Sequence, residues 1–221
     1  MSKSLACLTL CPVKPLVYAM VLLAGACSRS RGAEEAPPPA VMVPPAASSV
    51  TAPAKKPAET LERFLATVRT ALETRDVATL ARYAAPGGIR FDPYAFIAPE
   101  PTVVLTPNEL RGALTDPTLR KFGAYDGSGE PIVMTFAEYF DKFVRIPDLE
   151  HAQRAVDSTI GSGNTPSNLK QVFPDASFVE FHHAGSDPKY EGMDWQSVRV
   201  VFRRDGDHFR ILAIIHDQWT I

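Results

Sequence analysis

The sequence of 221 residues predicts an α+β domain, with helices first and long antiparallel strands last. Apolar residues recur at helical spacing over residues 59–75, which indicates an amphipathic helix. Apolar and polar residues alternate on both sides of Asp205-Gly206 in the final stretch, residues 193–221, and this pattern is typical of a β-hairpin. Because helices and strands are segregated along the chain, we expect an α+β fold and not a doubly wound parallel sheet.

The register of this hairpin decides which side chains face the core. If Asp205 and Gly206 fill the loop, Val198 lies opposite Ala213. Since side chains alternate between the two faces of a strand, one face collects an apolar set that needs a helical cover. This predicted core face carries Val198, Val200, Phe202, Phe209, Ile211, Ala213 and Ile215, and the opposite face carries Arg199, Val201, Arg203, His208, Arg210, Leu212 and Ile214.

The other elements are predicted from caps, turns and periodicity. Capping boxes at Thr106 and Thr135 begin two helices, and Asp76 caps a short second helix after the first. The segment 126–129 has the composition of a turn and is predicted to join a hairpin. Further predictions are strands over 89–96, 102–105 and 177–183, a helix over 149–156 and a loop over 161–166.

Residues 1–58 are predicted to precede the folded domain, which spans 59–221. Residues 1–26 have a positive start and an apolar run over 15–26 that is shorter than the roughly 20 residues of a membrane span, as in a signal peptide. Residues 27–58 are rich in Pro and Ala, so we expect a disordered tether. The three cysteines are Cys7, Cys11 and Cys27, so we expect no disulfide and no thiolate metal site in the domain.

The end of the signal peptide resembles a bacterial lipobox, Leu-Leu-Ala-Gly-Ala-Cys over residues 22–27. The resemblance implies that Cys27 becomes a lipidated N-terminus and anchors the chain to a membrane. Ser28, in place of an acidic residue, implies an outer-membrane lipoprotein that faces the periplasm or the cell surface. Ala24-Gly25-Ala26 also fits ordinary signal peptidase, so a secreted or soluble periplasmic form is the alternative.

The order of elements and the terminal hairpin resemble the NTF2-like (SnoaL-like) superfamily over residues 59–221. This resemblance implies a cone, in which a curved antiparallel sheet wraps the N-terminal helices and leaves a pocket between them. Residues 187–195 and 216–221 are also similar to uncharacterised bacterial lipoproteins.

Asp217 is the candidate catalytic residue, together with Asp194. Strand alternation places Asp217 on the apolar face and opposite Asp194, and two adjacent carboxylates that share a proton make a general acid or base. The resemblance implies that acids of this kind in the pocket are catalytic, as they are in NTF2-like isomerases and hydrolases. The alternative is that Asp217 pairs with an arginine such as Arg90 or caps a backbone N–H where the strand ends. A one-residue bulge would also move it to the other face.

The histidines and aromatic residues supply a candidate ligand-binding set. His182 and His183 are adjacent, so on a strand they point to opposite faces and do not share a metal. The same register places His216 on the outer face, across from Trp195. We expect no metal and no cofactor, and a ligand at the mouth of the cone that contacts Arg90, Tyr94, Tyr125, His183, Tyr190, Trp195, His216 and Trp219.

The preferred hypothesis is an envelope-anchored lipoprotein with a non-catalytic domain that binds a small molecule or an envelope protein. One alternative is a pocket enzyme, an isomerase or hydrolase that uses Asp217 with Asp194 or a histidine. A second alternative is a structural component of envelope assembly. The formal net charge is −2 with interspersed signs, so nucleic acid is not an expected partner, while the membrane is one through the anchor at Cys27.

Overall fold

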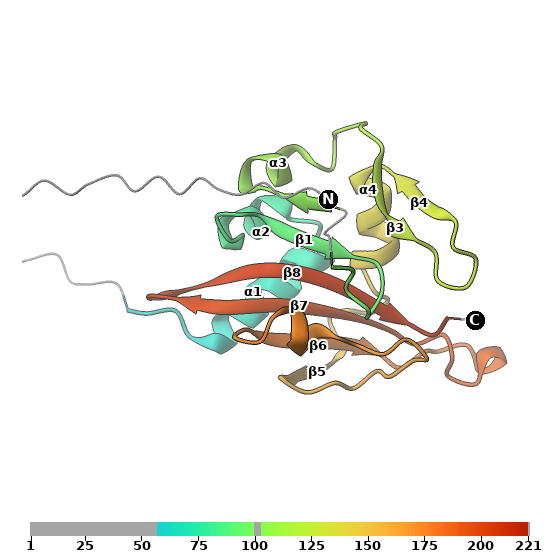
Figure 1. The fold of residues 1–221 in the computed structure, drawn as a ribbon. Helices are drawn as coiled ribbons and strands as arrows, with labels where there is room; N and C mark the ends of the chain where they lie inside the picture. The colour runs from blue at the N-terminus through green and yellow to red at the C-terminus, as the bar shows by residue number, and fades with distance from the viewer. Residues whose placement is uncertain (1–56, 100–102, 221) are drawn as a thin grey trace, which may run out of the picture. The chain divides into compact units, whose positions relative to one another are not determined.

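The computed structural model describes residues 57–99 and 103–220 (Figure 1). They lie within a compact unit, Pro53–Ile221. The predicted signal peptide and Cys27 lie outside the described residues. Among the helices that are described, none has the length and apolar character needed to cross a membrane.

A mixed six-stranded sheet forms the centre of the domain, in the order β2-β1-β8-β7-β6-β5. Strand β1 runs parallel to β8, and the other neighbours are antiparallel. The α+β class is therefore confirmed, whereas the expectation of a purely antiparallel sheet is wrong at β1. The strands are β1 (Ile89–Asp92), β2 (Val103–Leu105), β5 (Gln153–Val156), β6 (Ser177–His183), β7 (Gln196–Asp205) and β8 (His208–Gln218).

The helices begin where the sequence supplies caps. Thr60, Asp76, Thr106 and Thr135 each accept a hydrogen bond from the backbone N–H three residues later, which satisfies a donor that the first helical turn leaves free. A separate hairpin pairs β3 (Arg120–Ala124) with β4 (Pro131–Met134), as predicted. The helices are α1 (Leu61–Glu73), α2 (Val77–Tyr83), α3 (Pro107–Gly112), α4 (Phe136–Tyr139), the π-helix η1 (Phe140–Val144), α5 (Leu169–Val172) and the 3-10 helix η2 (Pro188–Tyr190).

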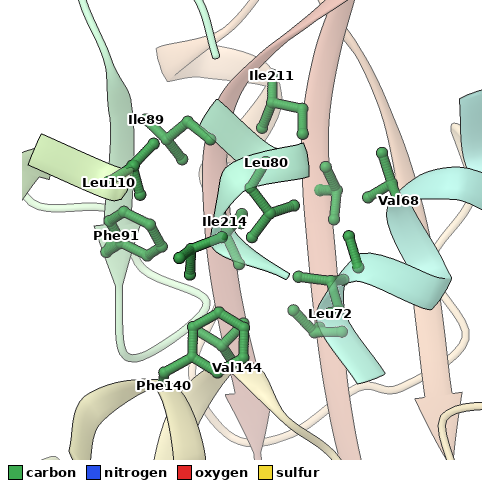
Figure 2. Packing of buried hydrophobic residues seen from close by; sticks show 14 of the residues in the cluster. Val68, Leu72, Leu80, Ile89, Phe91, Leu110, Phe140, Val144, Ile211 and Ile214 are labelled. Atoms are coloured by element: carbon green, nitrogen blue, oxygen red, sulfur yellow. The ribbon is translucent and has the colours of Figure 1, made fainter. Parts of the chain in front are cut away.

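The main hydrophobic core lies between the helices and one face of the sheet. Leu72 of α1 and Leu80 of α2 belong to the same cluster as Ile211 and Ile214 of β8 (Figure 2). Phe64 of α1 is fully buried and contacts three rings. Its centroid lies 4.8 Å from that of Phe209, 5.1 Å from that of Phe202 and 5.2 Å from that of Tyr83. These contacts fix α1 and α2 on the sheet.

The opposite face of the sheet is also covered. A second apolar cluster joins the segment around Ile97 and helix α5 to β6, β7 and β8. Both faces of the central strands are therefore buried, which is more typical of parallel sheets than of a solvent-facing antiparallel hairpin. The second cluster consists of Ile97, Leu169, Ala176, Phe178, Val201, Ala213 and Ile215.

The predicted hairpin register is wrong in two places. The loop residues are Gly206 and Asp207, because Asp205 pairs with His208; Gly206 has a φ of +59°, the conformation that a type II′ turn requires at its first loop position. Between β7 and β8 the register then shifts at Leu212. A bulge of this kind reverses the alternation beyond it.

The bulge redistributes the side chains of β8 between the two faces. Ala213 and Ile215 belong to the second cluster with Val201, whereas Ile214 belongs to the main core. The prediction had Ala213 and Ile215 on the core face and Ile214 opposite. Because of this single extra residue, everything in β8 after Leu212 lies on the face opposite to the predicted one.

The predicted helix over residues 149–156 is also wrong. Its second half, Gln153–Val156, forms the edge strand β5, which pairs with β6. Only a turn precedes it, held by hydrogen bonds from His151 N to Asp148 O (3.1 Å) and from Ala152 N to Leu149 O (3.4 Å). The backbone groups of this segment are satisfied by pairing with β6, so the tertiary context overrides a weak helical pattern.

Candidate functional site

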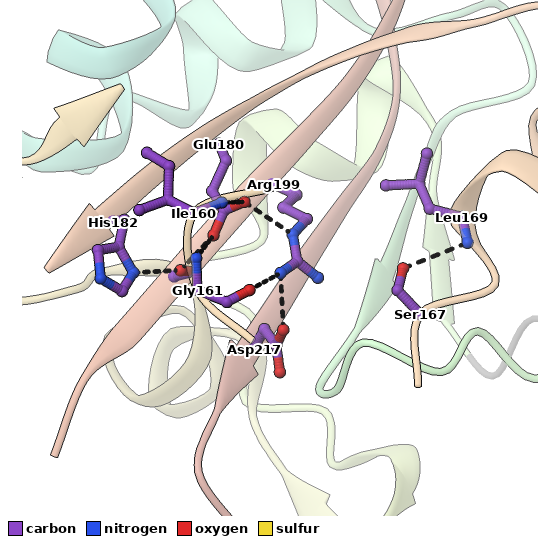
Figure 3. Close-up of polar contacts among 9 residues, drawn as sticks. Ile160, Gly161, Ser167, Leu169, Glu180, His182, Arg199 and Asp217 are labelled. Carbon is purple, nitrogen blue, oxygen red and sulfur yellow. Dashed lines mark hydrogen bonds and ion pairs between the residues drawn. The ribbon is translucent and has the colours of Figure 1, made fainter. Parts of the chain in front are cut away.

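A buried ion-pair network lies on the second face of the sheet, where β6, β7 and β8 are adjacent (Figure 3). Glu180 of β6 lies directly opposite Arg199 of β7, and Asp217 of β8 lies directly opposite Ser197 of β7. The exposed fractions of Glu180, Arg199 and Asp217 are 0%, 1% and 2%. Charged groups this far from water require partners.

Arg199 holds the network together. Its Nη2 donates to Asp217 Oδ2 at 2.7 Å and to Gly161 O at 2.9 Å, and its Nε donates to Glu180 Oε2 at 3.3 Å. Burial raises the pKa of Asp217 to about 6, although the nearby positive charge of Arg199 acts in the opposite direction. One guanidinium thus faces two carboxylates, and the network has an excess of negative charge when both carboxylates are ionised.

Both carboxylate oxygens of Glu180 accept hydrogen bonds. Besides Arg199, its two carboxylate oxygens accept from Ile160 N (2.9 Å), Gly161 N (2.9 Å) and Ser197 Oγ (2.6 Å). The loop that supplies these N–H groups lies directly on the sheet. A Cβ atom at Gly161 would come within 2.7 Å of Ser197 Oγ, so this close approach requires glycine.

The hydrogen bonds assign the protons of His182. Ser197 has one hydroxyl proton, and it donates that proton to Glu180. His182 Nδ1, 2.9 Å from Ser197 Oγ, must then be the donor to Ser197, so Nε2 carries the lone pair. Burial lowers the pKa of His182, which favours this neutral form. Glu180, Ser197 and His182 therefore form a relay that fixes the imidazole tautomer.

The relay ends at a depression in the surface with a volume of about 220 Å³. Figure 3 shows the second ring nitrogen of His182, Nε2, on the side away from the network, and no hydrogen-bond partner for it occurs in the described part of the chain. The Trp195 ring, 5.7 Å from the His182 ring between centroids, forms a wall. The lining residues are Ile160, Gly161, Ser162, His182, Ala184, Gly192 and Trp195.

The predicted pair of carboxylates is not formed. Asp194 lies in the loop before β7, where its Oδ2 accepts from Ser186 N (2.9 Å) and Asp187 N (3.0 Å), and these bonds lower its pKa. Ser197, and not Asp194, lies opposite Asp217. The cause is the changed turn together with the bulge at Leu212. The alternative interpretation, in which Asp217 pairs with an arginine, matches the structure, and the bulge that was considered separately is present.

The arginine in question is Arg199 and not Arg90. Arg90 of β1 is buried and pairs with Asp92 of the same strand at 2.8 Å, and its Nη2 also donates to Ala98 O at 2.6 Å. These contacts occupy Arg90 within the fold, so its predicted role in ligand binding has no support from its position.

Of the predicted ligand-binding residues, Trp195 alone lines the His182 depression. His183 points to the face opposite His182, as predicted. His216 lies under the helices with its ring 5.6 Å from that of Phe143, and burial lowers its pKa to about 4. Its predicted place on the outer face is wrong because of the bulge.

The four remaining predicted residues lie outside the depression. The ring of Tyr94 packs against that of Phe143. The Tyr125 hydroxyl accepts a hydrogen bond from Lys142 Nζ at 2.9 Å. Tyr190 and Trp219 are exposed.

Sequence reasoning missed Glu180, Ser197 and Arg199, and considered His182 only as a metal ligand. A signal was present: Glu180 and His182 are two residues apart, as are Ser197 and Arg199, so each pair shares one face of its strand. The predicted register placed Arg199 on the face opposite the predicted core, and the charged residues of that face had no predicted role. Among the residues with described positions, no group of three or more His, Cys, Asp or Glu is placed to hold a metal ion.

Comparisons with protein-family models, curated proteins and solved structures found no match to this chain.

The network predicts a specific pH dependence of stability. Because the folded pKa of Asp217 is about 6 and its usual value 3.8, the folded state binds more protons in this window, and the contribution of Asp217 to stability falls as the pH rises from about 4 to about 6. His216, with a folded pKa of about 4 against 6.5, acts oppositely. The contribution of His216 to stability rises over the same window, so the two contributions partly cancel in the pH profile of the wild-type protein.

Asp217→Asn removes only the falling contribution. We expect the unfolding free energy of the wild type minus that of Asp217→Asn to decrease by about 2 kcal/mol between about pH 4 and pH 6. Urea denaturation of both proteins across this range measures the difference. A difference that stays constant with pH would show that Asp217 titrates alike in the folded and unfolded states.

Proposed function

We propose that this chain is an envelope-anchored lipoprotein whose domain binds a small ligand at the His182 depression without converting it. The observation that carries the proposal is the relay from Glu180 through Ser197 to His182, which presents one fixed hydrogen-bond acceptor, Nε2, beside the Trp195 ring. A few convergent polar groups next to an aromatic surface are typical of small-molecule sites.

The chemistry of the depression favours a ligand that donates a hydrogen bond. His182 Nε2 has a lone pair and no proton in the assigned tautomer. The buried network behind it contains two carboxylates and one guanidinium, so its charge repels anions. A neutral hydroxyl or amide, or a small ammonium group, meets both conditions.

The absence of a catalytic role is proposed because the acidic groups are occupied. Glu180 and Asp217 both contact Arg199, and Asp194 is held by backbone N–H groups. An enzymatic alternative would use His182 as the general base, since a neutral imidazole backed by a hydroxyl and a carboxylate is able to accept a proton. Turnover of a compound by the wild-type protein that is lost in His182→Asn, which lacks Nε2, would favour this alternative.

An NTF2-like fold is part of the same proposal. It is supported by two N-terminal helices, α1 and α2, that pack on one face of a sheet whose longest strands, β7 and β8, end the chain. The space between these helices and the sheet contains apolar side chains such as Phe64 and Leu72. We therefore place the ligand on the other face of the sheet.

A matched pair of histidine variants tests the binding site. His182→Asn retains an amide donor for Ser197 at the position of Nδ1 and deletes Nε2, whereas His183→Asn makes the same change on the opposite face of β6. Small polar compounds are screened against the wild-type protein by NMR. We expect His182→Asn to weaken the binding of each hit by about five- to tenfold, the value of one hydrogen bond, and His183→Asn to leave it unchanged.

Equal affinities in both variants, or hits that perturb only residues remote from Trp195, would contradict the assignment of the site. Thermal unfolding of each variant serves as the control for folding.

Anchoring is tested separately at Cys27. If Cys27 carries the lipid, Cys27→Ser abolishes incorporation of a labelled fatty acid and moves the protein from the membrane fraction to the soluble fraction. An unlabelled wild-type protein in the soluble fraction would instead favour the secreted alternative.

A further inference from the structure

A second hollow, distinct from the His182 depression, lies between α1, α2 and the turn of the β7–β8 hairpin. Its volume is about 460 Å³, which is in the range of small-molecule sites. Arg63 of α1, Arg82 of α2 and Arg210 of β8 line it, and Glu59 supplies the one carboxylate among its described lining residues. We refer to this hollow as the arginine groove.

The three guanidinium groups keep hydrogen-bond donors available. The Arg63 guanidinium makes no hydrogen bond within the described part of the chain. Arg82 uses Nη2 on Thr79 Oγ1 at 2.7 Å. Arg210 uses Nε on Asp205 Oδ2 at 3.1 Å and Nη1 on Arg82 O at 3.1 Å. Because a guanidinium presents its N–H groups in a planar fork on three nitrogens, each of the three side chains has donors left for a ligand.

Glu59 does not neutralise these arginines. Its Oε1 accepts from the Tyr83 hydroxyl at 2.5 Å, and its Oε2 is buried without a partner among the described residues. No ion pair within the described residues joins Glu59 to an arginine of the groove, whereas Asp205 pairs with Arg210. The charge of Arg82 lies close enough to Asp76 to lower the pKa of that carboxyl. Among the described residues, Arg63 is the groove guanidinium with neither an ion pair nor a hydrogen bond.

Two aromatic residues, Tyr83 and Phe209, line part of the groove. Phe209 is 5% exposed and stacks on Phe64 with 4.8 Å between centroids, while Tyr83 contacts the same ring from its edge. Apolar walls lower the local dielectric constant and strengthen charge-assisted hydrogen bonds.

We propose that the arginine groove binds a phosphate group. Guanidinium groups recognise phosphate bidentately, and a doubly charged anion suits a site with an excess of positive charge. The groove is larger than a phosphate ion, so the phosphate can belong to a soluble phosphate ester or to a lipid headgroup. This site is independent of the His182 depression, and the two have opposite charge preferences.

The test uses the purified full-length protein and three charge-matched variants. Arg63→Gln and Arg82→Gln each remove a groove guanidinium. Arg111→Gln makes the same charge change on α3, where Arg111 is exposed and outside the groove. Inorganic phosphate and glycerol phosphate are titrated by calorimetry. Sedimentation with vesicles of phosphatidylcholine, with and without phosphatidylglycerol, then tests the lipid source; the N-terminal segment contributes equally in every variant.

We expect Arg63→Gln and Arg82→Gln to weaken binding at least about tenfold, since a charge-assisted hydrogen bond stabilises by about 1.5–3 kcal/mol, and Arg111→Gln to bind as the wild type does. Arginine-dependent binding of the soluble phosphates identifies a free ligand, and arginine-dependent binding of the phosphatidylglycerol vesicles identifies a headgroup. The proposal is overturned if neither source binds, or if all variants bind equally. Because the Arg63 guanidinium has no hydrogen bond to lose among the residues that the structure describes, a folding defect in Arg82→Gln does not affect this conclusion.

Discussion

The burial of one guanidinium inside the sheet constrains the rest of this structure. Arg199 is almost fully buried, and a charge at such a position is tolerated only with close partners of opposite sign. Glu180 and Asp217 provide them from the strands on either side. This requirement fixes the alignment of β6, β7 and β8, because a shift of one residue would turn the three side chains to different faces.

The bulge at Leu212 makes this arrangement possible. Without it, Asp217 would lie under the helices among the apolar residues of the main core, and His216 would take its place beside Arg199. With it, β8 supplies Ile211 and Ile214 to one cluster and Ala213 and Ile215 to the other. Bulges are frequent where a strand re-aims a functional side chain, and here the extra residue brings a carboxylate to a buried arginine.

The loop that contains Gly161 connects the buried ion-pair network to the surface of the domain. Gly161 closes the network by donating to Glu180 and accepting from Arg199. Its missing side chain leaves the Ser197 hydroxyl and the ring of His182 in contact. As a result, the direction of every hydrogen bond from Glu180 outward is determined, and the outermost acceptor, Nε2, lies at the rim where a ligand can reach it.

Local signals in the sequence predicted the α+β class, the caps at Thr106 and Thr135 and the existence of the hairpins. The registers were not predictable, because both Asp205-Gly206 and Gly206-Asp207 are acceptable loops and the choice between them depends on φ at Gly206. The bulge leaves no local signature, since Leu212 suits either face. The site was missed because the predicted register put Asp217 on one face of the sheet and Arg199 on the other. Only the tertiary structure shows that both lie on the second face and that this face is covered.

Arg199 and Asp217 are inferred to stabilise each other inside the sheet. A double-mutant cycle on unfolding free energies measures this coupling, with Arg199→Met, Asp217→Asn and the double variant in urea at neutral pH. We expect Asp217→Asn to be more favourable by at least about 1 kcal/mol in the Arg199→Met background than in the wild type, because the carboxylate has then lost its neutralising partner. Equal effects of Asp217→Asn in the two backgrounds would show that the two side chains do not stabilise each other.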